Sequence, residues 1–362
     1  MKITVLYGGQ SAEHDISILS THNILQQIMF DVYNVQPIYI TRQGRWIKGP
    51  MLEEPTAFSE QLRLEPAQVE SWCDDQNGVS TGVYINPGDI ADGDETIVFP
   101  ILHGPNGEDG TIQGFLEVLD LPYVGAGVTA SAAGMDKIIS KNLFERAGIP
   151  QVPYIAFDQR EWQSDKESLI ARCEGSLLYP LFVKPANLGS SVGISRVVDS
   201  QDLEAAVESA LQYDRRIVVE QGIRADEIEV AVLGNDDAHV SHVGQLIKHS
   251  DFYDYDEKYV NNEVEMQIPA EIPDHIVAQV QEYALDAYRA IDGSGLSRVD
   301  FFLTSSGDIY INEINTMPGF TQYSMYPNLW ASTGLSQRDL IEELLQLALR
   351  RKERKGHFKV EL

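Results

Sequence analysis

Three side chains that carry oxygen ligands stand close together in the segment SRVDFFLTSSGDIYINEIN. Glu313 and Asn315 are two positions apart, so in a strand both would point to the same face of the sheet. Asp300 lies on the preceding apolar run, two residues after Arg298, and could join them. Carboxylate and amide oxygens are the ligands that Mg²⁺ prefers, and Mg²⁺ commonly binds nucleotide phosphates as well. The pattern therefore predicts a magnesium site, with an ordinary solvated strand face as the alternative.

A second group of residues could bind phosphate. Lys184 ends an apolar run and precedes a loop of small residues, in FVKPANLGSSVGIS. The lysine would supply positive charge, while Gly189, Ser190, Ser191 and Gly193 would let amides and hydroxyls approach phosphate oxygens. The order differs from that of a Walker P-loop, in which the lysine follows the glycines. The alternative is a β-hairpin turn that binds no ligand.

Three further features are weaker when each is taken alone. Lys137, in SAAGMDK, could reach a phosphate or lie on a helix surface. Glu13 follows Gly8-Gly9 near the start of a helix, where it could bind a ligand or only stabilise the helix end. The segment 249–259, HSDFYDYDEKY, is rich in acids and tyrosines. It could order over a ligand as a lid or form an exposed acidic loop.

The elements that must position these residues follow from hydrophobic periodicity. The runs VDFFL and DIYINEI are rich in β-branched and aromatic residues, and Ser-Ser-Gly-Asp between them supplies a turn, so they predict a β-hairpin. The N-terminal ITVLYGG and ISILSTHNILQQI predict a strand, a glycine turn and a helix. The strand ETIVFPIL, the loop 103–110 and the helix TIQGFLEVL repeat that order. Such units are typical of α/β proteins.

The remainder of the chain predicts two further units. The first would open with a helix that carries Met135, Asp136 and Lys137, and would continue through a strand at Lys184 and the strand RRIVVEQGI. After Glu220 a third unit would contain the hairpin. The last helix ends in the basic segment RRKERKG, which is expected to be a solvated helix end.

Composition narrows the class of protein. A chain of 362 residues with 43% hydrophobic and 23% charged residues indicates an ordered globular protein of two or three domains. The net charge of −28 argues against nucleic acid or an anionic membrane as a partner. The N-terminus resembles no signal peptide, no apolar run approaches the length of a membrane span, and Cys73 and Cys173 have neither disulfide-framework nor metal-site spacing. We therefore expect a cytoplasmic protein.

Together these segments resemble the D-alanine–D-alanine ligases of the ATP-grasp superfamily. The matching pieces, in order, are YGGQSAEHDIS, ILHGPNGEDGTIQGFLE, SAAGMDK, FVKPANLGSSVGIS, FYDYDEKY, SRVDFF and NEINTMPGFTQYSMYP. The likeness covers nearly the whole chain and is weakest in the irregular segment 51–95. It implies the α/β three-domain ATP-grasp fold with a Rossmann-like N-terminal domain. The implied domains are an N-terminal D-alanine-binding domain (1–125), a central ATP-grasp subdomain (126–219) and a C-terminal ATP-grasp subdomain with the metal site and the lid (220–362).

The resemblance also implies which residues would bind ATP and metal. Asp300, Glu313 and Asn315 would hold Mg²⁺ or Mn²⁺, as two ions that bridge the phosphates of ATP, and a monovalent cation is a further candidate activator. The residues implied in ATP binding are Lys137, Lys184, Ser190, Ser191 and Lys258 near the phosphates, Glu220 near the adenine amino group, and Glu227 at the ribose.

A further set of residues is implied in binding and joining the substrates. These are Glu13, Ser190 and Tyr259 around the ammonium of the first D-alanine, Arg298 and the amide of Gly319 at the oxyanion, Ser324 and Met325 at the carboxylate of the second D-alanine, and His103 beside the substrate channel. Of these, Glu13, Ser190, Tyr259, Arg298 and Ser324 are the implied catalytic residues.

The implied reaction joins two D-alanines to D-alanyl-D-alanine through a D-alanyl phosphate, at the expense of ATP, for peptidoglycan precursors and hence cell-wall synthesis and cell shape. Tyr259 favours an amine as the second substrate, and D-alanine–D-lactate or D-alanine–D-serine ligation is the alternative within the family. More distant alternatives are another ATP-grasp ligase or carboxylase, a regulatory protein with a degenerate nucleotide site, and a Rossmann dehydrogenase. A homodimer is expected from the resemblance.

Overall fold

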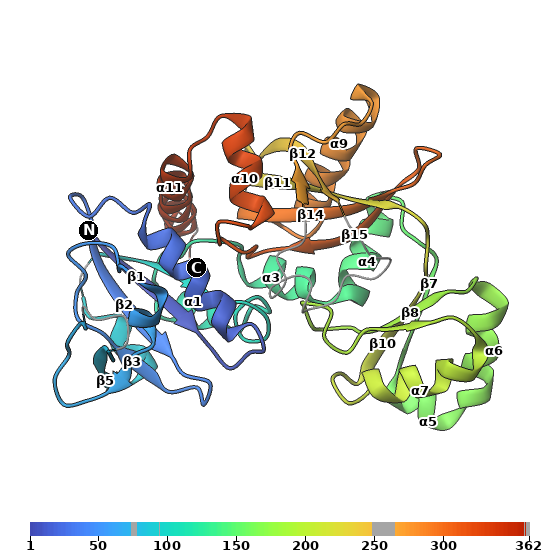
Figure 1. Ribbon diagram of the computed structural model, residues 1–362, viewed down its shortest axis with the longest axis horizontal. Coiled ribbons are helices and arrows are strands. Elements are labelled where there is room, and N and C mark those ends of the chain that lie inside the picture. The colour runs from blue at the N-terminus through green and yellow to red at the C-terminus, as the bar shows by residue number, and fades with distance from the viewer. Residues whose placement is uncertain (74–77, 94, 248–264, 358, 360–362) are drawn as a thin grey trace.

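Three separate β-sheets, each with helices packed against it, make up the protein (Figure 1). The computed structural model describes residues 1–73, 78–93, 95–247, 265–357 and 359. The strands of the three sheets fall in residues 2–101, 154–221 and 226–315, in chain order. The α/β class that was expected from alternating strand and helix patterns is therefore confirmed.

The first sheet has a parallel centre, in which β1 lies between β2 and β6. Its strand order is β4-β5-β3-β2-β1-β6. All residues of β1 and β6 are buried, as is typical of parallel strands covered on both faces. The strands are β1 (Lys2–Gly8), β2 (Asn34–Ile40), β3 (Trp46–Lys48), β4 (Glu65–Pro66), β5 (Thr81–Ile85) and β6 (Thr96–Ile101). The accompanying helices are α1 (His14–Leu25), α2 (Thr111–Val118) and the short 3₁₀ helices η1 (Ser59–Leu62) and η2 (Pro87–Ile90).

The turn after β1 explains its two glycines. Gly8 and Gly9 have φ angles of 90° and 96°, which L side chains rarely adopt. A Cβ on Gly8 would also lie 2.3 Å from the carbonyl oxygen of Ile40. The chain therefore passes tightly from β1 to the start of α1, which is where Glu13 lies.

The second sheet is antiparallel and has the order β7-β10-β8-β9. Leu181, Val183, Ile217 and Val219 point to one face, where they form a core with the sheet's three helices. The alternate residues of the same strands point to the opposite face, which the helices leave uncovered. The elements are β7 (Tyr154–Asp158), α5 (Gln159–Ser164), α6 (Lys166–Ser176), β8 (Leu181–Pro185), β9 (Ser195–Val197), α7 (Ser200–Ala210) and β10 (Arg216–Gln221).

The third sheet is also antiparallel, with the order β13-β12-β11-β14-β15. Strands β14 and β15 form the hairpin that the sequence predicts. Ile228, Val230, Val299 and Phe301 point to the face that α9 covers. The elements are β11 (Asp226–Gly234), β12 (His239–Ile247), β13 (Glu265–Gln267), α9 (Asp274–Ala290), β14 (Gly295–Leu303), β15 (Ile309–Asn315), α10 (Met325–Thr333) and α11 (Gln337–Gly356).

The helical stretch before the second sheet differs from the prediction of one helix across residues 135–137. The helix α3 (Val128–Met135) ends there, and a second helix, α4 (Lys137–Arg146), begins. Asp136 separates them because its carboxylate accepts hydrogen bonds from the amides of Ile138 and Ile139, at 3.0 Å each, as an N-cap. Lys137 is therefore the first residue of α4.

The hydrophobic cores show which segments of the chain pack on each sheet. Ala130 and Ala133 of α3 and Phe144 of α4 are buried in the core of the third sheet, together with α9. At the same time the amide of Lys137 donates to the carbonyl of Ala186, next to the second sheet. The stretch 126–149 thus packs on the third sheet and leads into the second. The domain boundaries at 126 and 220 stay a prediction, and we propose that α3 and α4 form the connection between the second and third sheets.

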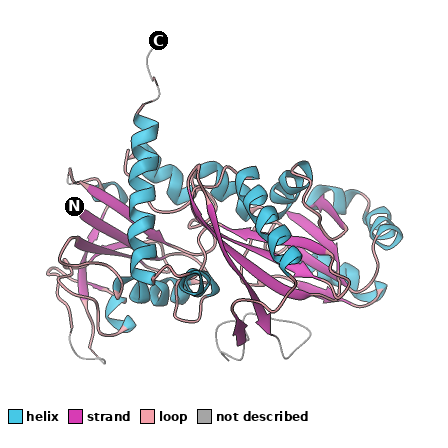
Figure 2. Ribbon diagram, turned by 90° about the horizontal axis from the view of Figure 1, so that it is seen from above, coloured by secondary structure: helices cyan, strands magenta, loops and turns pink. Residues whose placement is uncertain are grey.

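The last helix, α11, runs alongside the first sheet and contacts β6, β11 and β14 (Figure 2). Its basic end is not wholly solvated, contrary to the expectation. Arg351 lies with its guanidinium 4.2 Å from the ring centre of Tyr123 and donates to the Tyr123 carbonyl at 2.9 Å. It also donates to the Ser294 hydroxyl at 2.8 Å and to the carbonyl of Gly125. Arg351 therefore joins α11 to the segments that follow the first sheet and precede β14. Among the described residues, no helix is both long and apolar enough to span a membrane.

Candidate active site

The face of the third sheet opposite α9 carries most of the predicted metal and oxyanion residues. In the strand register Asp300 lies opposite Glu313, and Arg298 lies opposite Asn315. Glu229, on β11, lies opposite Asp300 on its other side. Directly opposed residues point to the same face, so all five side chains project from one surface. They lie on the face that α9 does not cover.

A network of ion pairs connects these side chains. The Nε and Nη2 atoms of Arg298 donate to the two carboxylate oxygens of Asp300, both at 2.7 Å. The Nε atom of Arg298 also lies 2.8 Å from a carboxylate oxygen of Glu229. The Nδ2 atom of Asn315 donates to Asp300 at 3.0 Å. The paired, planar geometry fixes the guanidinium of Arg298 at the edge of the acidic group.

The acidic group has the donor chemistry of a divalent cation site. Burial raises the pKa of Asp300 above its ordinary value; Arg298 opposes this shift, and the neighbouring Glu313 carboxylate adds to it. Two carboxylates held together in this way favour a cation between them. Among the described residues no three His, Cys, Asp or Glu side chains come together as a metal cluster. The expected set contains two carboxylates and the amide of Asn315, which suit Mg²⁺.

The second sheet contributes a group of buried charges on its uncovered face. Lys184 lies opposite Val218 and Glu220 lies opposite Phe182, so Lys184 and Glu220 are diagonal neighbours on one face. Lys184 forms an ion pair with Glu220. The Nζ atom of Lys141, on α4, lies 2.6 Å from the other carboxylate oxygen of Glu220. Tyr154, opposite Glu220 in the register, places its ring centre 4.9 Å from Lys141 Nζ.

These charges shift one another's pKa values. Burial alone would raise the pKa of Glu220, but Lys141 and Lys184 lower it to about 2. Burial would likewise lower the pKa of Lys184, but Glu220 and Glu313 raise it above its ordinary value. The pKa of Lys137 is lowered by burial, although Glu313 opposes the shift. Glu313 of the third sheet thus acts on lysines from the connecting helix and the second sheet, which indicates that these charged faces of the two sheets lie near each other.

The loop between β8 and β9 carries the predicted phosphate-binding residues. Ser190 and Ser191 have φ angles of 52° and 60°, in the left-handed region that non-glycine residues seldom occupy. The Nζ atom of Lys137 donates to the carbonyl of Leu188, 2.5 Å away. Two of the predicted lysines, Lys137 and Lys184, therefore flank this loop.

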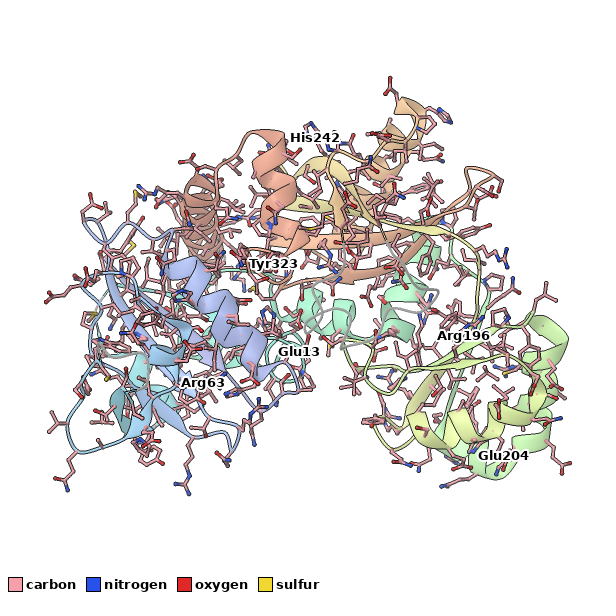
Figure 3. All side chains as sticks on the ribbon, viewed as in Figure 1. Glu13, Arg63, Arg196, Glu204, His242 and Tyr323 are labelled. Atoms are coloured by element: carbon pink, nitrogen blue, oxygen red, sulfur yellow. The ribbon has the colours of Figure 1, made fainter. Side chains whose placement is uncertain are left out.

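Glu13, from the N-terminal part, contacts the loop between β8 and β9. The hydroxyl of Ser190 donates to the carboxylate of Glu13. Glu13 also lies beside Gly104, where a Cβ would approach its carboxylate to 2.6 Å. It lies near the middle of the molecule, at the junction of the N-terminal part with the rest (Figure 3). Residues that are far apart in the sequence thus meet here.

His103 is buried beside Glu13 and connects two segments. One ring nitrogen lies 3.2 Å from the hydroxyl of Ser20, and the other lies 3.2 Å from the carbonyl oxygen of Met317. Burial lowers the pKa of His103, while the charge of Glu13 opposes that shift. His103 therefore links α1 to the segment that follows β15.

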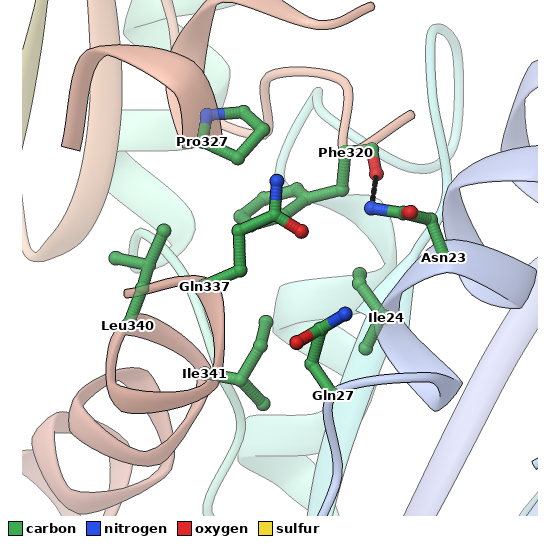
Figure 4. Close-up of a pocket in the computed structure, with 8 residues that line it drawn as sticks. All are labelled: Asn23, Ile24, Gln27, Phe320, Pro327, Gln337, Leu340 and Ile341. Carbon is green, nitrogen blue, oxygen red and sulfur yellow. Dashed lines mark hydrogen bonds between the residues drawn. The ribbon is translucent and has the colours of Figure 1, made fainter. Parts of the chain in front are cut away.

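The segment 316–324 is anchored on α1 and places the remaining predicted residues. The Nδ2 atom of Asn23 donates to the carbonyl of Phe320 at 2.6 Å, within a pocket that has no charged residue in its lining (Figure 4). The hydroxyl of Ser324 accepts from the amide of Thr321 at 2.9 Å. A Cβ on Gly319 would lie 2.8 Å from that hydroxyl, so the turn needs glycine there. The side chain of Met325 is buried in the core, so any contact of Met325 with a substrate would come from its backbone.

Two predicted residues cannot be placed. Lys258 and Tyr259 lie outside the described residues, together with the whole of the segment 249–259 that was predicted to be a lid. Glu227 is at the start of β11, and its charge contributes to the raised pKa of Lys184. Glu227 therefore lies near the group of buried charges on the second sheet.

Sequence reasoning missed Glu108, Lys141 and Glu229. Glu108 stands in the loop HGPNGEDG, and its carboxylate accepts from the amide of Gly104 at 2.6 Å. The alternation of acids in DEIEV on β11 is a signal that could have found Glu229, because it shares a face with Glu227. For Lys141 the position four residues after Lys137 on one helix was the available signal.

The pH dependence of stability can test the placement of Glu108. Burial, with Glu13 adding to the effect, raises the pKa of Glu108 from 4.5 to about 8. Because the folded-state pKa is the higher one, protonated Glu108 stabilises the fold fully below pH 4.5, and this contribution is lost as the pH rises through about 8. We expect the melting temperature of the ligand-free wild type to fall more between pH 6 and 9 than that of Glu108→Gln. Identical pH profiles for the two proteins would contradict this placement.

Comparison with known proteins agrees with this arrangement. A family profile described as "D-ala D-ala ligase N-terminus" matches residues 2–126, and one described as "D-ala D-ala ligase C-terminus" matches residues 143–346. The chain is similar to a D-alanine–D-alanine ligase from Enterococcus hirae (55% identical, 99% of both chains covered). It is also similar to one from Listeria monocytogenes serovar 1/2a (48% identical, 100% of this chain and 99% of the relative covered).

Solved structures show the same likeness. The D-alanine–D-alanine ligase from Coxiella burnetii has 33% sequence identity and a TM-score of 0.78, with 98% of this chain and 96% of that chain covered. The VanG D-Ala:D-Ser ligase from Enterococcus faecalis has 35% identity and a TM-score of 0.79, with 96% of this chain and 99% of that chain covered. These likenesses confirm the expected ATP-grasp fold. The chain therefore belongs to the D-alanine–D-alanine ligase family.

Proposed function

We propose that this chain joins two D-alanines into D-alanyl-D-alanine with the conversion of ATP to ADP and phosphate, for the synthesis of peptidoglycan precursors in the cytoplasm. The proposal is supported by the names of its full-length relatives. It is supported as well by the contact between the N-terminal part and the loop after β8, where Ser190 donates to Glu13. A homodimer is part of the proposal, from family likeness alone.

The first step would activate a carboxylate. A carboxylate is a poor electrophile, so the γ-phosphoryl group of ATP is transferred to a carboxylate oxygen of the first D-alanine, which gives D-alanyl phosphate and ADP. Phosphoryl transfer needs positive charge around the moving group and exact positioning of the acceptor. Lys137 and Lys184 would supply the charge, and the loop with Ser190 and Ser191 would supply amides and hydroxyls. Glu13 would hold the ammonium of the first D-alanine.

The second step would form the peptide bond. The neutral amine of the second D-alanine attacks the acyl carbon, and the resulting tetrahedral oxyanion collapses with loss of inorganic phosphate and a proton. Arg298 and the Gly319 amide are the proposed donors to the oxyanion. Arg298 is held by Asp300 and Glu229, so its position is set before the reaction. Preorganised donors of this kind typically contribute about 3 kcal/mol to transition-state stabilisation.

Asp300, Glu313 and Asn315 would hold the divalent metal. When bound there, Mg²⁺ or Mn²⁺ supplies positive charge that neutralises the phosphates of ATP. The raised pKa of Asp300 and the proximity of Glu313 support a cation at this place. The number of ions, two by family pattern, and activation by a monovalent cation remain part of the proposal.

Release of ADP tests the function. With Mg²⁺-ATP and D-alanine the purified protein is expected to release ADP at a rate that depends on D-alanine, and mass spectrometry is expected to find D-alanyl-D-alanine. The same assay with D-serine or D-lactate added beside D-alanine measures the choice of second substrate. D-alanyl-D-lactate or D-alanyl-D-serine in excess of D-alanyl-D-alanine at neutral pH would move the assignment to the alternative ligases. If the rate of ADP release did not depend on D-alanine, D-serine or D-lactate, the ligase assignment would be rejected.

A further inference from the structure

A buried lysine at the nucleotide site has no role in the reaction as described above. Lys141 lies on α4, one helical turn after Lys137, and its side chain is only 3% exposed. Its Nζ atom lies 2.6 Å from Oε1 of Glu220, whose side chain is 4% exposed. The backbone of Lys141 is held as well, because Gln151 Nε2 donates to its carbonyl at 2.8 Å. The ammonium lies 4.9 Å from the ring centre of Tyr154, so the aromatic face adds to its electrostatic stabilisation.

Glu220 is shared between two lysines of unequal accessibility. Lys141 pairs with Oε1 of Glu220, while Lys184 pairs with Oε2. The side chain of Lys184 is 12% exposed, four times the fraction for Lys141, and it flanks the loop that contains Ser190 and Ser191. Lys184 is therefore the member of the pair that can turn toward a bound phosphate. Lys141 is enclosed and remains beside the carboxylate.

A buried carboxylate that loses its partner is strongly destabilised, because desolvation is no longer offset by an opposite charge. If Lys184 were the sole partner of Glu220, binding a phosphate through Lys184 would leave such a carboxylate behind. Building on the proposed ATP-dependent function, we propose that Lys141 is a positioning residue. It is the permanent counter-ion of Glu220 and so allows Lys184 to exchange Glu220 for the phosphates of the nucleotide.

The proposal predicts a selective defect in Lys141→Met, a substitution of similar length without the charge. Removal of the ammonium leaves Lys184 as the remaining partner of Glu220 in this group, so phosphates and Glu220 must compete for it. We expect the Kd for ADP, measured by calorimetry, to rise about 10- to 100-fold. The Kd for adenosine, which carries no phosphate, should change by less than about threefold, because its binding does not require Lys184 to leave Glu220.

The double variant Lys141→Met/Glu220→Gln tests the same idea without an unpaired buried charge. With a neutral glutamine at 220, Lys184 has no carboxylate to leave, so the ratio of the ADP and adenosine affinities should return to within about threefold of the wild-type ratio. Lys166→Met is the matched control. Lys166 also pairs with a glutamate, Glu204, at 2.7 Å and lies over an aromatic ring, that of Trp162, but its side chain is 37% exposed on the outer helices of the second sheet. In Lys166→Met the ratio of the ADP and adenosine affinities should equal the wild-type ratio.

Three outcomes would overturn the proposal: an unchanged ADP affinity in Lys141→Met, an equal loss of ADP and adenosine affinity, or a double variant with the same ratio as Lys141→Met. An equal loss would assign Lys141 a purely structural role. These measurements use nucleotide binding alone. D-alanine-dependent ADP release by the wild type tests the proposed function separately, so failure of the one can be told from failure of the other.

Discussion

Replacing Glu313 with glutamine is expected to reduce the rate constant for D-alanine-dependent ADP release by about 10³-fold or more, since the metal's contribution to charge stabilisation amounts to several kcal/mol. The change removes one negative charge from the pair of carboxylates while it keeps the size of the side chain. Glu313 lies opposite Asp300 in the hairpin, and its charge acts on Lys137 and Lys184 as well. A metal ligand at this position would therefore lie where the phosphates and the lysines meet.

Glu313→Gln is a cleaner test than Asp300→Asn. Asp300 also holds Arg298 through two hydrogen bonds of 2.7 Å, so its replacement would disturb the proposed oxyanion donor together with the metal site. We expect Asp300→Asn to be at least as inactive as Glu313→Gln. A matched control is Asp308→Asn, an acid at the opposite end of the same hairpin, whose hydrogen bonds to other described residues all lie within its own turn. Its activity should remain within about twofold of the wild-type value, as is usual for surface substitutions.

A second readout separates loss of metal from loss of fold. In the wild type, Mg²⁺ should strengthen the binding of ADP, and titration of Mg²⁺ against a fixed ADP concentration measures this linkage. In Glu313→Gln the Mg²⁺ dependence should weaken markedly while the melting temperature without ligands stays close to that of the wild type. Full activity in both Glu313→Gln and Asp300→Asn would remove the metal assignment.

The shared face of the proposed metal ligands could be predicted from the sequence because a strand has a strict period of two. The positions of Asp300, Glu313 and Asn315 along two β-rich runs separated by a turn were sufficient to place them on one face of a hairpin. The same rule extends to Glu229 on the neighbouring strand, because it lies opposite Asp300. Such local patterns hold because the turn and the alternation of apolar residues specify the register.

Contacts between segments that are distant in the sequence could not be predicted from such local patterns. A helix position such as Lys141 has the same local pattern whether it faces solvent or a buried carboxylate, and its burial depends on the packing of α4 between two sheets. Arg351 was expected in solvent for the same reason, although it lies against Tyr123, far away in the sequence. The break at Asp136 is different. An aspartate followed by a helical segment is a recognisable N-cap, so this error came from reading Met-Asp-Lys as one helical stretch.

The meeting of Glu13 with Ser190 could be inferred only through the family resemblance. No local rule connects a helix start in the first sheet's unit with a loop in the second, which are 177 positions apart. The structure brings the two side chains into hydrogen-bonding contact. It also brings Gly104 beside the Glu13 carboxylate, where a Cβ would approach to 2.6 Å, and Gly189 into ordinary contact distance, where a Cβ would lie 3.4 Å away. Small residues thus leave space around this carboxylate, which favours a role for Glu13 in binding a small ligand.

Glu13→Gln should therefore act on D-alanine and leave the nucleotide unaffected. Removing one partner of a buried charge pair costs about 2 to 5 kcal/mol. If Glu13 binds the ammonium of the first D-alanine, kcat/KM for D-alanine should fall about 30- to 1000-fold or more. The affinity for ADP should change by less than about twofold, because the proposed nucleotide contacts come from the other two sheets. Initial rates over a range of D-alanine concentrations, with ADP binding by calorimetry, would measure both quantities.

Asp15→Asn provides the matched control on the same helix. Asp15 pairs with Arg42 at 2.6 Å and with Arg63 at 2.9 Å, and its side chain is 48% exposed, so its ion pairs contribute at most about 1 kcal/mol to stability. Its replacement should leave kcat/KM for D-alanine within about twofold of wild type. Equal losses in Glu13→Gln and Asp15→Asn would mean that the charge at the start of α1, and not a contact with substrate, is what matters. A loss confined to Glu13→Gln would mean that the carboxylate held by Ser190 recognises the amino acid, while the hairpin and the lysines act on the phosphates.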